Sequence, residues 1–175
     1  RDPKAFRDQV EPTGQLDPET FAANERWESD QRIADVRVIM PDGSIGRPVL
    51  TAWLDWRTRR CVAHRVEAYG DSETISTSLH AALTDKANAG GPPAIAWFDN
   101  GVDYLSVAGK SRKAPKFDAA DTPQVRGLLA WLGIDLHLAL PGGPRGKARI
   151  ERWFQTKGMQ LDAFLPGASG NEPKN

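Results

Sequence analysis

The chain has 175 residues, of which 39% are hydrophobic and 26% charged, and its formal net charge is zero. This length and composition are typical of one soluble globular domain that is long enough to bury a core. No apolar run reaches membrane-spanning length and the first residues show no signal-peptide pattern, so we expect a cytoplasmic protein.

The single cysteine and the first residue further limit the kinds of protein that this chain can be. Cys61 has no second cysteine to pair with, which excludes an internal disulfide and a cysteine-based zinc site. Because the chain starts at Arg1 without a methionine, we expect a fragment of a longer protein.

Charge is distributed unevenly along the chain. Residues 1–100 carry 12 Lys/Arg against 16 Asp/Glu, whereas residues 101–175 carry 11 against 7. The basic residues of the second part gather at 110–116 and 145–157. This pattern indicates two basic loops around an acidic centre.

The first half of the chain predicts an arm followed by three strands. Residues 1–25 are polar and broken by prolines, and we interpret them as a linker that ends in a short helix. Alternating apolar residues over 27–40 predict a strand, and the Pro-Asp-Gly-Ser turn that follows predicts a hairpin. The runs 48–56 and 61–68 then complete a three-stranded antiparallel meander.

The second half predicts helices alternating with strands. Helical spacing of apolar residues appears at 71–90, 122–132 and 148–164. Short apolar runs at 94–98 and 134–140 predict two further strands. The order β-β-β-α-β-α-β-α predicts an α/β fold with a mixed five-stranded sheet, in which the meander is joined by two parallel strands and helices cover both faces.

These elements give the expected domain organisation. We expect residues 1–25 to form an N-terminal arm, residues 26–165 to form one folded core domain, and residues 166–175 to form a disordered tail.

Three acidic residues stand where separate elements could converge. Asp99 follows the predicted strand 94–98, Glu151 lies in the first turn of the last helix, and Asp30 lies at the head of the first strand. Two of them also have a purely structural explanation, since Asp99 can cap its turn and Glu151 can interact favourably with the helix dipole. For Asp30, the nearby acids Asp35 and Glu28 are alternatives.

Together, the three carboxylates would suit hard divalent cations such as Mg²⁺, which prefer oxygen ligands. Two such ions can activate an attacking oxygen and stabilise a leaving one at a phosphodiester. Since phosphoryl transfer depends mainly on positioning and electrostatics, acids alone can suffice.

At these residues the sequence resembles the DDE recombinases with an RNase H-like core, and among them the bacteriophage Mu-type transposases. Asp30 and Asp99 are 69 positions apart, and Asp99 and Glu151 are 52, both consistent with the Mu-like branch. The stretches that carry the resemblance are 29–38 (SDQRIADVRV), 41–43 (PDG) with 47–48 (RP) and 53–59 (WLDWRTR), 97–101 (WFDNG), and 146–154 (GKARIERWF).

The resemblance implies a bacterial or phage-encoded, metal-dependent transposase with an RNase H-like sheet. Asp30, Asp99 and Glu151 would be its catalytic and metal-binding residues, with Asp35 as the alternative first acid. Two Mg²⁺ (or Mn²⁺) ions would bind per active site when DNA is present. The enzyme would nick transposon ends with water and join the freed 3′-hydroxyl to target DNA.

The same resemblance implies partners. They are transposon-end DNA and target DNA, on which the protein would be oligomeric, although the isolated core could be monomeric. The predicted phosphate-contacting residues surround Glu151, and the alternative for them is a solvated basic helix face. They are Arg145, Lys147, Arg149, Arg152 and Lys157.

Two features depart from a complete enzyme of this type. The net charge is neutral, and neither a helix-turn-helix end-binding domain nor a basic C-terminal domain is recognisable. We therefore expect an isolated catalytic core, in which the glycine- and proline-rich loop at 141–146 leaves Glu151 displaced until DNA assembles the site. The alternative functions are an RNase H-like nuclease or resolvase that cuts without joining, and a non-catalytic DNA-binding or assembly domain.

Overall fold

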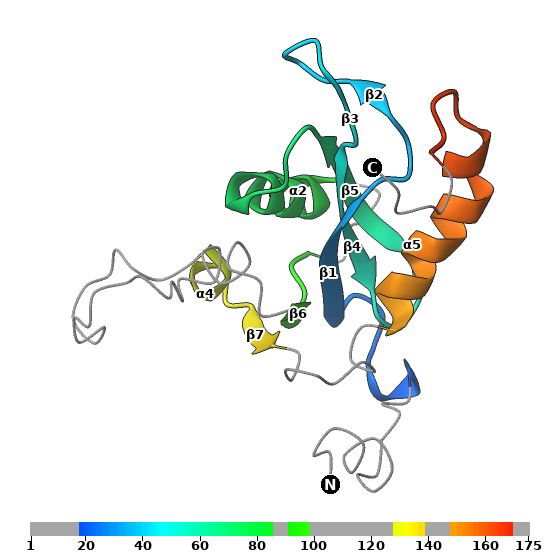
Figure 1. Cartoon of the computed structure of the whole chain (residues 1–175). Helices are drawn as coiled ribbons and strands as arrows, with labels where there is room; N and C mark the ends of the chain where they lie inside the picture. The colour runs from blue at the N-terminus through cyan, green and yellow to red at the C-terminus, as the bar shows by residue number, and fades with distance from the viewer. Residues whose placement is uncertain (1–17, 86–90, 99–127, 139–147, 170–175) are drawn as a thin grey trace, which may run out of the picture.

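A five-stranded sheet forms the centre of the protein, with helices on both of its faces (Figure 1). The computed structural model describes residues 18–85, 91–98, 128–138 and 148–169. The strand order is β5-β4-β1-β6-β7. The strands are β1 (Arg26–Ile33), β4 (Val49–Asp55), β5 (Cys61–Glu67), β6 (Ile95–Phe98) and β7 (Asp135–Leu138).

Strand β1 occupies the middle of the sheet. It pairs antiparallel with β4, which pairs antiparallel with β5. On its other side β1 pairs parallel with β6, which pairs parallel with β7. This confirms the predicted meander joined by two parallel strands.

Helix α2 (Ser72–Thr84) covers one face of the sheet. Asp71 caps its N-terminus by accepting a hydrogen bond from the Thr74 amide at 2.8 Å. The core beneath it is built around Trp53, whose ring packs edge-on against Trp27 and Phe98 at centroid distances of 6.3 and 5.4 Å. The short helix α4 (Leu128–Trp131) adds Leu129 to the same core.

Helix α5 (Ala148–Gln160) covers the opposite face. Ile150 and Phe154, four residues apart and so on one side of the helix, pack against β4 residues. Those residues are Leu50, Ala52 and Leu54. Among the described residues no helix is both long and apolar enough to cross a membrane.

The first strand is shorter than the sequence predicted. It ends at Ile33, paired with Val49, because Pro48 accepts a hydrogen bond from the Ala34 amide at 2.8 Å but has no amide hydrogen to return. The last part of the predicted strand instead contributes one strand to a separate two-stranded ribbon, which projects beyond the sheet in Figure 1. Its strands are β2 (Val38–Ile39) and β3 (Ile45–Gly46).

The chain ends also differ from the predictions. The arm's helix is a single 3-10 turn, η1 (Pro18–Thr20). At the other end, the predicted helix stops at Gln160, Leu161 is 50% exposed, and a 3-10 turn, η4 (Asp162–Phe164), follows. Two parts of the predicted elements lie outside the described residues: residues 1–17 of the arm, and residues 122–127 of the helix predicted at 122–132.

The tail that we expected to be disordered from residue 166 is ordered up to Ser169. Ala168 forms an antiparallel bridge with Val36, and the Gly167 carbonyl accepts a hydrogen bond from the Arg37 amide at 2.8 Å. Gly167 has φ of +88°, and a Cβ there would lie 2.4 Å from the Arg37 carbonyl oxygen, so only glycine fits. These backbone contacts, which the polar composition does not reveal, hold residues 167–169.

Two phenylalanines near the C-terminus test whether burial of apolar side chains holds α5 on the sheet. Phe154 is 3% exposed and Phe164 is 81% exposed. We expect Phe154→Ala to lower the free energy of unfolding by about 3–5 kcal/mol, because it removes a buried ring and leaves a cavity. We expect Phe164→Ala to change it by about 0.5 kcal/mol or less.

Urea denaturation of both variants measures the difference. Equal losses would contradict the packing of α5 on the sheet.

Candidate active site

The side chains of β1 alternate between the two covered faces of the sheet. Trp27 points into the core under α2, while Arg26 and Glu28 lie on the α5 side, each 1% exposed. By the same alternation Asp30 belongs to the α5 side. One face of the central strand therefore carries only charged residues from Arg26 to Asp30.

Asp30 lies within β1, where it faces Ala52 of β4. Its Oδ1 accepts a hydrogen bond from the Gln31 amide at 2.9 Å, and the residue is partly buried. Ala52 is one of the residues that α5 covers, so Asp30 is paired with a residue of the sheet surface against which α5 packs.

Glu151 lies in the first turn of α5, directly after the fully buried Ile150. Since successive helical residues are rotated by about 100°, Glu151 is turned away from the packed side of the helix. Its side chain is exposed.

Asp99, the third predicted acid, lies outside the described residues. It directly follows Phe98, the last residue of β6, and Trp97 of that strand pairs with Glu28. Within the described residues, no three His, Cys, Asp or Glu side chains lie together in a way that could hold a metal ion.

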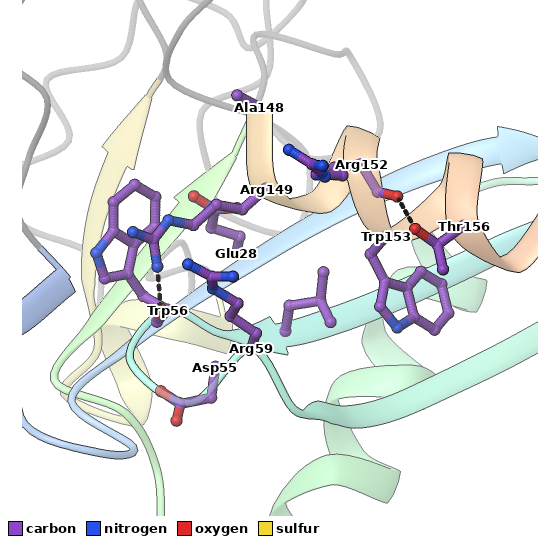
Figure 2. Close-up of a pocket in the computed structure, with 10 residues that line it drawn as sticks. Glu28, Asp55, Trp56, Arg59, Ala148, Arg149, Arg152, Trp153 and Thr156 are labelled. Carbon is purple, nitrogen blue, oxygen red and sulfur yellow. Dashed lines mark hydrogen bonds between the residues drawn. The ribbon is translucent and has the colours of Figure 1, made fainter.

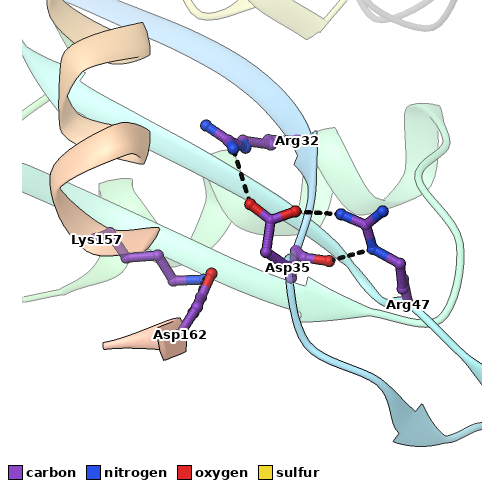
Figure 3. A network of polar contacts seen from close by, with 6 residues as sticks. Arg32, Asp35, Arg47, Lys157 and Asp162 are labelled. Atoms are coloured by element: carbon purple, nitrogen blue, oxygen red, sulfur yellow. Dashed lines mark hydrogen bonds and ion pairs between the residues drawn. The ribbon is translucent and has the colours of Figure 1, made fainter. Parts of the chain in front are cut away.

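Asp35, the alternative first acid, lies beyond the end of β1 and is bound by two arginines (Figure 3). Arg32 Nη2 is 2.9 Å from Asp35 Oδ2, and Arg47 Nη2 contacts Oδ1. Arg47 Nε also donates to the Ala34 carbonyl at 2.8 Å. This carboxylate joins the end of β1 to the chain that leads into β4.

A buried arginine cluster beside β1 was not predicted. The Arg26 guanidinium carbon lies 3.8 Å from the Trp56 ring centroid, 4.0 Å from that of Trp97 and 5.2 Å from that of Phe21. Its Nη2 is 3.8 Å from Glu28 Oε1. Burial lowers the pKa of Arg26 to about 10, opposed by the Glu28 charge and assisted by that of Arg149. The predicted strand began at Trp27, so Arg26 lay just outside it, and the only available signal was an opposite charge two residues away from Glu28.

The predicted phosphate-contacting residues are found in different settings. Arg149 Nη1 donates to the Trp56 carbonyl at 2.6 Å. Arg149 and Arg152 both line a cleft between α5 and the end of β4, which is shown in Figure 2. Lys157 Nζ lies 2.6 and 2.8 Å from the two oxygens of the buried Asp162 carboxylate. Arg145 and Lys147 lie outside the described residues.

Comparison with known protein families matches residues 19–165 to the family described as bacteriophage Mu transposase. The chain belongs to this family. It is therefore a member of the DDE transposase superfamily, as the resemblance predicted.

Two curated transposases are similar to this Mu-type domain in sequence. The transposase for transposon Tn552 of Staphylococcus aureus is 27% identical over 158 residues, which cover 87% of this chain and 30% of that protein. The Mu-like prophage FluMu transposase A of Haemophilus influenzae is 32% identical over 130 residues, covering 71% and 18%. The chain thus spans less than a third of either relative.

Solved structures show the fold. A chain of the simian T-cell lymphotropic virus intasome, solved in complex with PP2A regulatory subunit B56 gamma, matches with a TM-score of 0.51 at 16% identity, over 82% of this chain and 44% of that one. The catalytic core domain of BIV integrase matches with a TM-score of 0.45 at 10% identity, over 81% and 71%. The sheet order and the first match confirm the RNase H-like fold of this catalytic-core-like domain.

The Arg26–Glu28 pair yields a stability prediction for this Mu-type domain. We expect Arg26→Met to lower the free energy of unfolding by about 3–5 kcal/mol, because it leaves the Glu28 charge buried beside an apolar side chain. We expect the double variant Arg26→Met with Glu28→Leu to recover much of that loss.

A double-mutant cycle in urea, with Glu28→Leu as the fourth member, measures the coupling. Additive losses would show that the two charges do not depend on each other.

Proposed function

We propose that the chain is the catalytic core of a DNA transposase that nicks transposon ends with water and joins the freed 3′-hydroxyl to target DNA. Asp30, Asp99 and Glu151 would be its catalytic and metal-binding residues. The observation that carries the proposal is that β6 pairs with β1 in the sheet and α5 contacts β1, and each of these elements holds or directly precedes one of the three acids.

The register between β1 and β6 supports the pairing of the two aspartates. Glu28 pairs with Trp97, and Asp30 and Asp99 each follow two residues later along these parallel strands. Consecutive Cα atoms are 3.8 Å apart, so the position after Phe98 stays close to the end of β6. Trp97 contacts Arg26 on the α5 side, so β6 presents a described residue to that side.

The donor set fits hard divalent cations. Carboxylates supply oxygen ligands, which Mg²⁺ and Mn²⁺ prefer, and the neighbouring face is already polar. When bound, two such ions would supply the activation of the attacking oxygen and the stabilisation of the leaving one.

The chain's own residues would hold and orient the DNA. Glu151 stands in the first turn of α5 with its carboxylate toward solvent, where bound DNA can reach it. Arg149 and Arg152 flank it and would contact phosphates, together with Arg145 and Lys147. For Lys157, Asp162 competes with phosphate for the ammonium group.

The partners would be transposon-end DNA and target DNA, with several copies of the protein assembled on them. The family match and the two transposase relatives support this assignment.

The contrast between Asp30 and Asp35 tests the site. We expect Asp30→Asn to lower both end cleavage and strand transfer by about 10²–10³-fold, the size typical of losing one preorganised charged group. We expect Asp35→Asn to keep both activities and to lower the free energy of unfolding by about 1 kcal/mol, since it weakens the ion pairs with Arg32 and Arg47.

Cleavage of intact transposon ends and joining of pre-cleaved ends, each with Mg²⁺ or Mn²⁺, measure the two activities, and urea denaturation measures stability. An inactive Asp35→Asn beside an active Asp30→Asn would refute the assignment of the first acid. Wild-type cleavage without joining would identify a nuclease or resolvase, and wild-type DNA binding without either reaction would identify an assembly domain.

A further inference from the structure

We propose that the cleft between the β4–β5 turn and the first turns of α5 binds a phosphate group of the DNA backbone, with Arg59 as a ligand alongside Arg149 and Arg152. The inference rests on the proposed function for the identity of the ligand as DNA. It adds a specific binding site and a residue, Arg59, that lies far in sequence from the basic segment around Glu151.

The cleft has a volume of about 400 Å³ and is bounded by two separate elements (Figure 2). Arg59 enters it from the β4–β5 turn, and Arg149 and Arg152 enter from α5. Within the described ranges, neither Arg59 nor Arg152 forms an ion pair with a carboxylate. Guanidinium groups arranged around a hollow suit a phosphate, whose oxygens accept several charged hydrogen bonds.

The two acids of the cleft are engaged elsewhere. Asp55 Oδ2 accepts hydrogen bonds from the Thr58 amide at 3.1 Å and hydroxyl at 2.5 Å, and Asp55 Oδ1 accepts one from the Asn24 amide at 3.1 Å. In Figure 2 its carboxylate points away from the arginines. Glu28 lies 3.8 Å from Arg26. Positive charge therefore dominates the hollow.

One of the two tryptophans that line the cleft is already occupied by arginines. The Trp56 ring already has the guanidinium carbons of Arg26 and Arg149 at 3.8 and 4.1 Å from its centroid. Beside Trp56, a ligand would therefore be held by charge and not by stacking on this ring, as expected for a phosphate.

The backbone of Arg59 provides an independent observation. Its φ is +62°, in the left-handed region that glycine adopts without cost and a long side chain does not. Its amide donates to the Asp55 carbonyl at 2.9 Å, which closes the turn. Strained backbone of this kind clusters at functional sites, where the side chain is needed despite its conformation.

The position of the cleft fits a phosphate close to the reacting one. Glu28 lines the cleft and lies two residues before Asp30 on β1, a separation of about 7 Å along a strand. A strand of DNA that reaches Asp30 along this face therefore passes the three arginines.

Replacing Arg59 by glycine removes the side chain that would contact phosphate and at the same time suits the left-handed backbone of this position. We expect Arg59→Gly to lower DNA affinity about tenfold and to reduce the slope of log K against log salt by about 0.9, the loss of one phosphate contact. We also expect its melting temperature to rise by about 2–4 °C, because glycine relieves the left-handed strain.

Arg60→Gly is the matched control, since Arg60 is the next residue and does not line the cleft. It removes the same charge from the same turn, and we expect its affinity to stay within about twofold of the wild type. Its melting temperature should fall, because glycine loosens a position that is not left-handed.

The measurement is fluorescence anisotropy of a labelled 20-base-pair DNA across a salt series without metal, beside thermal denaturation. Wild-type affinity in Arg59→Gly, or equal losses in Arg59→Gly and Arg60→Gly, would overturn the inference while leaving the proposed function intact. A wild-type protein that binds no DNA would refute both.

Discussion

The structure depends on a central strand that is covered on both sides and yet charged on one of them. Buried charges are tolerated only when they are paired or otherwise stabilised. Strand β1 meets this constraint with an ion pair between Arg26 and Glu28, and the Arg26 guanidinium is covered by Trp56 and Trp97. These contacts connect β1 to the end of β4 and to β6.

Helix α5 links the apolar and charged parts of this face. Ile150 and Phe154 fix it to β4 by burial, whereas its first turn extends over the charged part, where Arg149 contacts Trp56 through both its guanidinium plane and a hydrogen bond. Glu151 lies in this first turn. The same packing that stabilises the fold therefore holds the first turn of α5, which carries Glu151, on the sheet face to which Asp30 belongs, and this is the geometric basis of the proposed function.

The periodicity of the sequence predicted the five strands of the sheet, α2 and the apolar side of α5, because each is encoded by residues close together in the chain. The Arg26 cluster could not be predicted, since its aromatic partners come from three separate segments and a strand pattern gives only the face. The early end of β1 depends on Pro48 opposite Ala34, a pairing fixed only by register. Asp35 illustrates the limit for the site: spacing did not separate it from Asp30, whereas its contacts with Arg32 and Arg47 do distinguish their settings.

The proposed metal site draws one carboxylate from β1, one from the residue after β6 and one from α5. Replacing Mg²⁺ by Fe²⁺ in the DNA-bound protein, adding ascorbate and peroxide, and mapping the cut polypeptide by mass spectrometry would locate that site directly. We expect cuts at three places, next to Asp30, just after Phe98 and in the first turn of α5, all lost in Asp99→Asn. Cuts confined to the surroundings of Asp35 and Asp162, or unchanged by Asp99→Asn, would contradict it.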